Sequence, residues 1–261
     1  MRFNVSASGL SGATGRGGVL AAPLIKEKGQ SAHTTEIDRR SGGQLTALRA
    51  VGEGSATRFH FSSSPAGTLP ADQLLFAGLG SAESLDRQAI VRWAAAVTRK
   101  LAGRNIRRLV IDAAPIVAAL KGASPALRAN GGASFGEGIN ASSKVKLDAA
   151  VLAVELIVRG VIEGSFHEGL DGKSQVDAFP APLESVEILL PTGSDLTAAK
   201  AAVRRSEIIA DGTVRTKRWA NRPANEMPPL GIAEEARDRA RAVGLRARII
   251  GARELERMGA G

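Results

Sequence analysis

The sequence has no cysteine and no tyrosine, and it has only three histidines in 261 residues. Without cysteine there can be no disulfide framework, no thiolate metal site and no cysteine nucleophile. The histidines, His33, His60 and His167, are far apart in the sequence and form no paired metal-ligand spacing. Aromatic residues make up 3% of the chain, which disfavours functions that need stacking platforms, such as single-strand nucleic-acid binding.

Long apolar runs are missing as well. No run of about 18 apolar residues could span a bilayer, and residues 1–10 lack the continuous apolar segment of a secretory signal. We therefore expect a soluble, cytoplasmic protein without a membrane partner. Apolar residues still make up 44% of the chain, which is enough for a buried core built mainly from Leu, Ile, Val and Ala.

The net charge of +9 is unevenly placed along the chain. From Lys200 to the end, fourteen Lys or Arg stand against eight Asp or Glu. Such a surplus can bind phosphate backbones non-specifically, so weak nucleic-acid binding is one interpretation. The other is that Ala-rich and Arg-rich helices simply expose solvated charged faces.

Residue patterns predict an α/β fold. Short apolar or alternating runs bounded by Gly and Pro predict strands at 3–5, 18–22, 58–61, 74–77, 108–112, 186–190 and 245–250. Apolar spacings of three and four predict helices at 86–102, 146–162, about 194–221, 228–244 and 252–258. Ser194 or Asp195 can cap the third of these helices. Because a helix joins strands 74–77 and 108–112, these strands should lie parallel.

Two further stretches differ from this pattern of strands and core helices. The Gly-rich stretch at 130–143 predicts a long flexible loop. The elements after residue 228 have an apolar side, but the sequence offers almost nothing against which they could bury it.

Two Gly-containing stretches raise the question of an anion site. EGLDGKS, residues 168–174, is similar to a phosphate-cradling loop, but such a loop needs glycine at position 167, where this chain has His167. AGLGSAESLDRQ, residues 77–88, places glycines between a strand and a helix, where an α/β sheet can bind anions. A plain strand-to-helix turn is the favoured interpretation of the second stretch, because any such turn can use glycine.

One pair of carboxylates has the spacing of metal ligands. Glu234 and Asp238 stand four apart on one helical face and could share a metal ion. Alternatively, Glu234 and Glu235 are first-turn carboxylates that the helix dipole stabilises, and Asp238 pairs with a neighbouring Arg. No nucleophile with an adjacent His and a glycine elbow is visible. The residues alone therefore indicate no catalytic, cofactor-binding or metal-binding residue.

The stretch WANRPANEMPPLGIAEEARDRARAVG, residues 219–244, resembles the interdomain junction of the leucyl (cytosol) aminopeptidase family. There, an Asn, Pro and Asn cluster precedes a Pro-initiated helix rich in Ala and Glu. RSEIIADGTVRTKRWANRPAN is similar to that family's interdomain helix, and SGGQLTAL to an early helix of its N-terminal domain. LLFAGLGSAESLDRQAIVRWAAAVTRKLAG resembles a strand and helix of the same domain, and ELIVRGVIEGSFHEGLDGKS resembles its last helix.

The resemblance implies a macro-like N-terminal domain at 1–192, a mixed sheet flanked by helices. It also implies an interdomain linking helix at 193–221 and a truncated start of a second α/β domain, the catalytic one, at 222–261. Asn221, Pro223 and Asn225 match the family's junction and are interpreted as structural, because proline fixes the local backbone and short Asn side chains satisfy loop amides.

The family's enzymes release N-terminal amino acids from peptides with two bridged divalent ions, commonly manganese, zinc or magnesium. Their ligands, a Lys and several carboxylates, lie in a Lys-Gly motif and an Asn-Thr-Asp-Ala-Glu-Gly-Arg signature that this sequence lacks. We therefore expect no catalytic, cofactor or metal residue in this chain and no peptidase activity from it alone. Peptides become partners only if a catalytic domain is supplied, and the family's hexamers imply a homo-oligomer.

A different function remains open. The macro-like domain and the basic C-terminal quarter could form a stand-alone module that binds nucleic acid or another anionic ligand.

Overall fold

The computed structural model describes residues 1–11, 17–26, 31–102, 104–122, 148–166, 183–223 and 225–259. The predicted loop at 130–143 and the stretch at 168–174, which lacks one glycine of a phosphate loop, lie outside these ranges. The chain divides into two compact units, Met1–Gly212 and Thr213–Gly261. In the described ranges, no helix is long and apolar enough to cross a membrane.

The first unit is built on a six-stranded mixed sheet with the order β1-β6-β5-β2-β4-β3. All neighbouring strands are parallel except β3, which pairs antiparallel with β4 at one edge. This arrangement confirms the predicted fold class of a mixed sheet with flanking helices. The strands are β1 (Arg2–Ser6), β2 (Val19–Lys26), β3 (Phe61–Pro65), β4 (Gln73–Ser81), β5 (Arg108–Asp112) and β6 (Ser185–Leu189).

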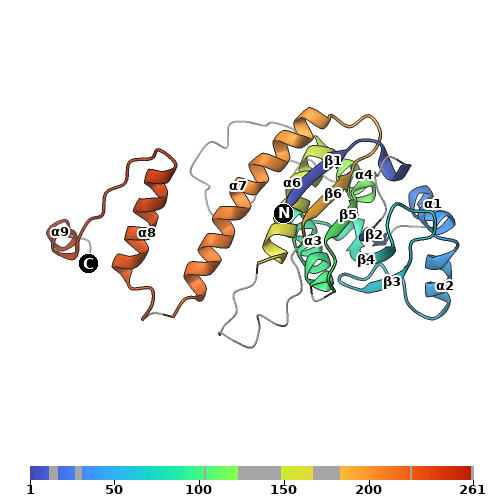
Figure 1. The fold of residues 1–261 in the computed structure, drawn as a ribbon, viewed down its shortest axis with the longest axis horizontal. Helices are drawn as coiled ribbons and strands as arrows, with labels where there is room; N and C mark the ends of the chain where they lie inside the picture. The colour runs from blue at the N-terminus through green and yellow to red at the C-terminus, as the bar shows by residue number, and fades with distance from the viewer. Residues whose placement is uncertain are drawn as a thin grey trace. The chain divides into compact units, whose positions relative to one another are not determined.

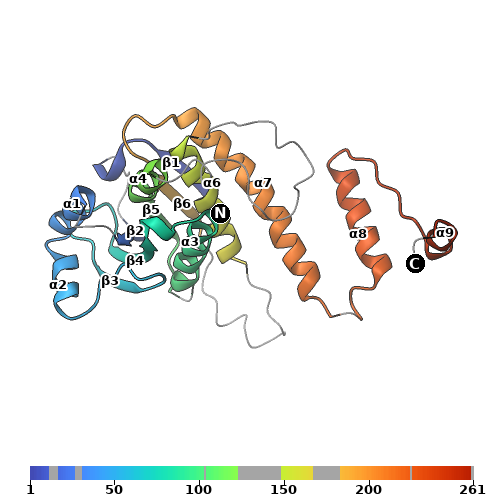
Figure 2. The same ribbon diagram turned by 180° about the vertical axis from the view of Figure 1, so that it is seen from behind.

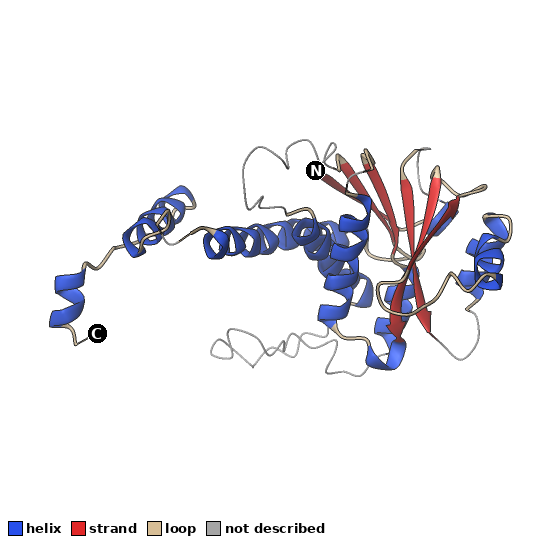
Figure 3. Cartoon of the chain, turned by 90° about the horizontal axis from the view of Figure 1, so that it is seen from below, coloured by secondary structure: helices blue, strands red, loops and turns tan. Residues whose placement is uncertain are grey.

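Helices cover both faces of the sheet (Figure 3). α1 and α2 lie on one side, and α3, α4, α6 and the first part of α7 lie on the other, as Figures 1 and 2 show from opposite directions. The helices are α1 (Ala32–Arg40), α2 (Gln44–Ala50), α3 (Arg87–Leu101), α4 (Ala114–Gly122), α6 (Ala149–Gly164) and α7 (Leu196–Asn221). Short 3-10 turns at Gly9–Ser11 and Ala82–Ser84 complete the described elements of this unit.

Strand β2 contributes side chains to two hydrophobic cores. Val19 and Ala21 belong to the larger core under α3 and α6, whereas Leu20, Ala22 and Leu24 belong to the smaller core under α1 and α2. Successive side chains of a strand point to opposite faces, so a central parallel strand must be apolar throughout. All five residues are at most 3% exposed.

The predicted pairing around α3 is confirmed in direction. β4 and β5 are both parallel to β2, which lies between them. β2 was predicted to end at residue 22, before Pro23, but the strand continues to Lys26. Pairing with β5 stops at Ala21, so Pro23 lies where only β4 accompanies β2 and where the sheet tolerates a residue without an N–H.

Helices α6 and α7 follow the predictions closely. Asp148 caps α6 because its Oδ1 accepts hydrogen bonds from the N–H groups of Ala150 and Val151. Asp195, one of the two predicted caps, accepts from Thr197 and Ala198 at the start of α7. α7 runs without a break through Gly212.

Two predicted strands are wrong. Residues 58–61 form a turn with Phe59 at φ +63°, and strand β3 begins only at Phe61. Residues 245–250 have no strand structure, because no described strand of the second unit offers a partner for their backbone groups. Helices α1 and α4 were not predicted from the sequence. Each is only nine residues long, and α4 is apolar almost throughout, so it lacks the alternation of polar and apolar faces that indicates a helix.

The second unit contains α8 (Pro229–Ala242) and α9 (Ala252–Arg257). α8 begins as predicted at the proline pair, where the first amides need no intrahelical partner. Large apolar side chains stay exposed in this unit, including Leu230 at 60%, Leu245 at 63% and Met258 at 63%. The prediction that these elements bury little of their apolar side is confirmed for the described residues.

Helices α3 and α6 approach each other at backbone distance. A Cβ atom at Gly160 would lie 2.3 Å from the carbonyl oxygen of Val91 and 2.7 Å from the Cβ of Ala94. One turn later, a Cβ at Gly164 would lie 2.6 Å from the Cα of Ala95. Only glycine at both positions lets α6 pack this closely on α3.

We expect Gly160→Ala to lower the free energy of unfolding by about 1–3 kcal/mol, because the added methyl group forces two packed helices apart. Gly212→Ala is the matched control, since a Cβ there has no heavy atom within 4 Å. That change should leave stability equal or raise it by up to about 1 kcal/mol. Urea titrations followed by circular dichroism measure both, and a Gly160→Ala chain as stable as the parent contradicts the packing argument.

Candidate functional site

The predicted anion-binding turn lies at the carboxyl end of β4. Asp86 caps α3, with its Oδ1 accepting from the N–H of Ala89 at 2.6 Å. Ser81 likewise accepts from the N–H of Glu83 within the preceding 3-10 turn. Because the helix start is already occupied by a carboxylate of the chain itself, a second negative group is disfavoured there. The geometry favours the plain-turn interpretation.

A histidine and a carboxylate meet at the carboxyl edge of the sheet. His33 Nε2 donates to Asp112 Oδ2 at 2.5 Å, although the two residues are 79 positions apart. Asp112 ends β5 and is fully buried, and its other oxygen accepts from the N–H of Ala114 at the start of α4. His33 lies in the first turn of α1, whose cap is Ser31. The pair therefore ties α1 to the centre of the sheet.

The charge on His33 depends on this carboxylate. Burial lowers the pKa of His33, but the hydrogen bond to Asp112, the charge of Asp112 and the charge of Glu36 outweigh burial, so the pKa is raised above its ordinary value. A cation in the first turn of a helix is unfavourable with respect to the helix dipole. The buried carboxylate offsets that cost. No nucleophile within the described residues is bonded to the histidine, so the pair acts as a structural link.

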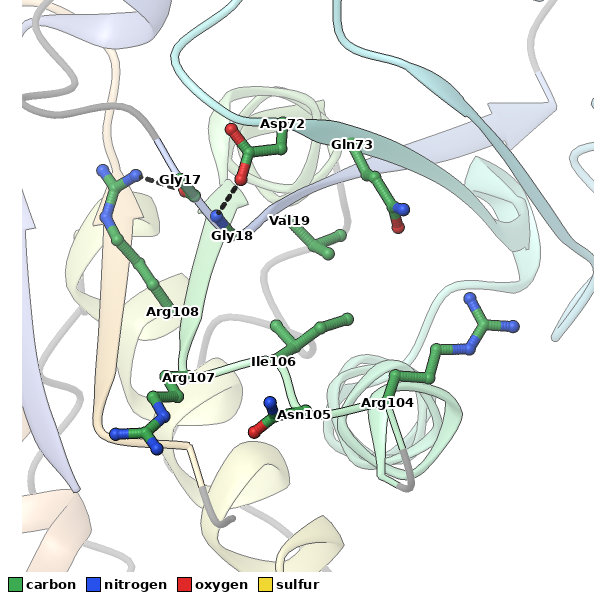
Figure 4. Close-up of a pocket in the computed structure, with 10 residues that line it drawn as sticks. All are labelled: Gly17, Gly18, Val19, Asp72, Gln73, Arg104, Asn105, Ile106, Arg107 and Arg108. Atoms are coloured by element: carbon green, nitrogen blue, oxygen red, sulfur yellow. Dashed lines mark hydrogen bonds between the residues drawn. The ribbon is translucent and has the colours of Figure 1, made fainter. Parts of the chain in front are cut away.

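A hollow of about 460 Å³ lies at the opposite, amino-terminal edge of the parallel strands (Figure 4). It contains three arginines and the first residues of three strands. The lining residues are Gly17, Gly18, Val19, Asp72, Gln73, Arg104, Asn105, Ile106, Arg107 and Arg108.

Two of the three arginines of this hollow bond to other parts of the fold. Arg108 Nη2 lies 2.7 Å from Glu187 Oε2, and its Nη1 donates to the carbonyl oxygen of Gly17 at 2.9 Å. Arg107 forms an exposed ion pair with Glu184 at 2.7 Å. The three guanidinium groups lie apart and do not converge on one point (Figure 4). The hollow therefore lacks the convergent donors that hold a phosphate or carboxylate.

The two carboxylates with metal-ligand spacing do not form a metal site in the described structure. Glu234 and Asp238 both lie exposed on α8, and Asp238 Oδ1 is 3.2 Å from Arg237 Nε. This ion pair confirms the alternative prediction for Asp238. Glu235 pairs with Arg222 at 3.2 Å. Across the described ranges, no three His, Asp or Glu side chains group so that they could hold a metal ion, and these residues do not fit a two-metal centre.

The junction residues make a compact turn. The carbonyl oxygen of Pro223 accepts from the N–H groups of Glu226 and Met227, at 2.9 and 3.1 Å. Asn221 is the last residue of α7 and, like Asn225, it is exposed. Met227 is the one buried apolar residue among the described residues of the second unit. The turn at Pro223 is therefore part of the structure that leads from α7 into α8.

The described residues define a mixed α/β domain that is followed by a small helical unit. Residues 20–129 match the model of the cytosol aminopeptidase family, N-terminal domain. This match confirms the predicted resemblance: residues 20–129 are similar to the N-terminal domain of the cytosol aminopeptidase family.

Curated relatives are similar to this chain over most of its length. The probable cytosol aminopeptidase of Syntrophotalea carbinolica is 26% identical over 242 residues, which cover 92% of this chain and 41% of that protein. The corresponding protein of Thermosynechococcus vestitus is 27% identical over 252 residues, which cover 94% and 43%. The chain thus spans about two-fifths of the length of these relatives.

Two solved structures share the fold. A mutant of tomato leucine aminopeptidase aligns with a TM-score of 0.67 at 17% identity, covering 98% of this chain and 46% of that chain. The bottromycin maturation enzyme BotP in complex with Mn aligns with a TM-score of 0.53 at 21% identity, covering 92% and 40%.

Stability should depend on pH through His33. A group whose pKa is raised on folding stabilises the fold below its unfolded pKa, and that contribution is lost as the pH rises through the folded pKa. The free energy of unfolding should therefore decrease as the pH rises from about 6.5 through the raised pKa of His33.

Asp112→Asn tests the cause, because asparagine can still accept from Ala114 but carries no charge. NMR titration of the His33 ring should show a lower pKa in this variant, and urea titrations should show a flatter pH dependence. A His33 pKa in the folded parent at or below that of the unfolded chain contradicts the assignment.

Proposed function

We propose that this chain forms the N-terminal part of a leucyl-aminopeptidase-like protein that removes N-terminal residues from peptides. The observation that carries the proposal is the family match over residues 20–129, extended by relatives that align with more than 90% of the chain. In this proposal, the two divalent ions are bound by residues in the part of the relatives that does not align with this chain.

The chain's own residues support a structural role. Two partly buried cations are paired with carboxylates of the chain itself, Arg108 with Glu187 and His33 with Asp112. The junction at Pro223 and the exposed apolar face of α8 support a role in which the second unit leads into a further domain. Homo-oligomerisation, expected from the resemblance, and a cytoplasmic location, expected from the sequence, stay predictions.

The basic surplus of the second unit favours solvated helix faces over a phosphate-binding surface. Within this unit, the guanidinium groups of Arg222, Arg237 and Arg248 are paired with carboxylates. Mixed charges of this kind cancel much of the field that a polyanion requires.

The purified chain should not hydrolyse leucine p-nitroanilide. In buffer with Mn²⁺, the rate should equal that of a control with chelator, because the described residues do not fit a two-metal site. Tomato leucine aminopeptidase serves as the positive control in the same buffer. A rate that rises with Mn²⁺ and disappears with chelator would show that this chain carries its own catalytic centre.

We also propose the division into a macro-like domain at 1–192, a linking helix at 193–221 and the start of a second domain at 222–261. A chain that ends at Asn221 should then unfold within about 1 kcal/mol of the full chain, because residues 225–259 bury only Met227. Urea titrations of both chains provide the comparison. A markedly lower midpoint for the shorter chain contradicts this division.

A further inference from the structure

Strand β1 forms one edge of the sheet. Among the described strands it pairs only with β6, through bonds that include Arg2 N–H to the carbonyl oxygen of Glu184 and Leu190 N–H to the carbonyl oxygen of Ser6, both 2.8 Å. In a parallel pair, alternate residues direct both backbone groups to the same neighbour. Arg2, Asn4 and Ser6 therefore face β6, and the backbone groups of the residues between them face away from the sheet.

The outward-facing residues are Phe3 and Val5. Among the described residues, neither has a backbone hydrogen-bond partner on the side that faces away from β6. Their side chains pack, partly buried, against the larger core, which anchors the strand, and no described strand covers its outer edge. An edge with free N–H and C=O groups is a template for adding another strand.

A groove of about 380 Å³ runs beside this edge, between β1 and the first half of α7. Its apolar part comes from Phe3, Val5 and the buried Val203. Its α7 side carries two exposed cations, Lys200 and Arg204, neither of which has an ion-pair partner among the described residues. The lining also includes Glu207, so its net charge is positive.

We propose that β1 and this groove bind an extended acidic peptide segment of a partner protein, which adds as a seventh strand. Backbone hydrogen bonds to Phe3 and Val5 provide the affinity, and carboxylates of the peptide pair with Lys200 and Arg204. A second copy of the chain fits this edge less well, because it would bring its own Lys200 and Arg204 against the same cations. The proposal does not depend on the proposed peptidase function.

The probe is a fluorescein-labelled seven-residue peptide of alternating Thr and Glu, with a Thr and Lys peptide of the same length as its control. Fluorescence anisotropy with the full chain should show saturable binding of the Glu peptide, at least about tenfold tighter than the Lys peptide, and weakening as salt screens the charges. Equal binding of both peptides, or no binding of the Glu peptide at low salt, overturns the proposal.

Val5→Pro tests the backbone contacts. Proline at position 5 removes an N–H that faces away from β6, so an edge strand tolerates it while the added strand loses a donor. We expect at least about tenfold weaker binding, whereas Val5→Thr keeps the N–H and should bind like the parent. Equal affinity of the Val5→Pro chain for the Glu peptide overturns the strand-addition geometry.

A second measurement leaves the protein unchanged. A Glu peptide N-methylated at alternate residues loses the donors on one edge, and of the two possible methylation patterns only one should abolish binding. If both methylated peptides bind as well as the parent peptide, the backbone is not recognised and the proposal fails.

Charge reversal tests the partner chemistry. Lys200→Glu and Arg204→Glu should each weaken binding of the Glu peptide by at least about threefold at low salt, with a smaller effect at high salt. Lys121→Glu in α4 is the matched control, because it changes the net charge equally but lies outside the groove. An equal loss in all three variants, or dimerisation of the chain that Val5→Pro abolishes, points to another occupant and overturns the assignment.

Discussion

The close contact between α3 and α6 is the constraint on which the first unit depends. Gly160 and Gly164 bring the backbone of α6 onto α3, and this distance lets both helices cover the same face of the sheet. Trp93 fills the space beneath them, and its Nε1 donates to the carbonyl oxygen of Ala77. A chain with few aromatic residues and many alanines can build a dense core in this way, because small side chains allow backbones to approach.

The charged side chains at the ends of β5 also hold neighbouring elements in place. Arg108 lies at the start of β5 and bonds Glu187 of the neighbouring strand β6 and the backbone at Gly17, while Asp112 at the other end of β5 holds His33. Both ends of one central strand are thus fixed by polar contacts to other elements. Buried charges that are satisfied in this way stabilise the positions of loops and helices, and they leave few groups free for chemistry.

Much of this fold could be predicted from the sequence, because the β4–α3–β5 region combines apolar strands with one long amphipathic helix. Predictions from local residue patterns failed where contacts with distant parts of the chain determine the secondary structure. Residues 245–250 alternate like a strand but have no described partner in their unit, and β2 continues through Pro23 because β5 no longer pairs there. The pair of His33 and Asp112 could not be predicted either, since only the folded sheet brings together residues 79 positions apart.

The two edge strands of the sheet, β1 and β3, differ in residues that affect pairing with a further strand. β3 ends in Pro65, which has no N–H, and Lys100 lies 5.9 Å above the ring of Phe61 at its start. Proline and a covering cation blunt an edge against further pairing. β1 has neither proline nor such a cover in the described structure, and it lies beside a groove with two unpaired cations. β3 is thus protected against pairing with a further strand, whereas β1 is not. This difference agrees with the proposal that β1 is the edge that binds a partner strand.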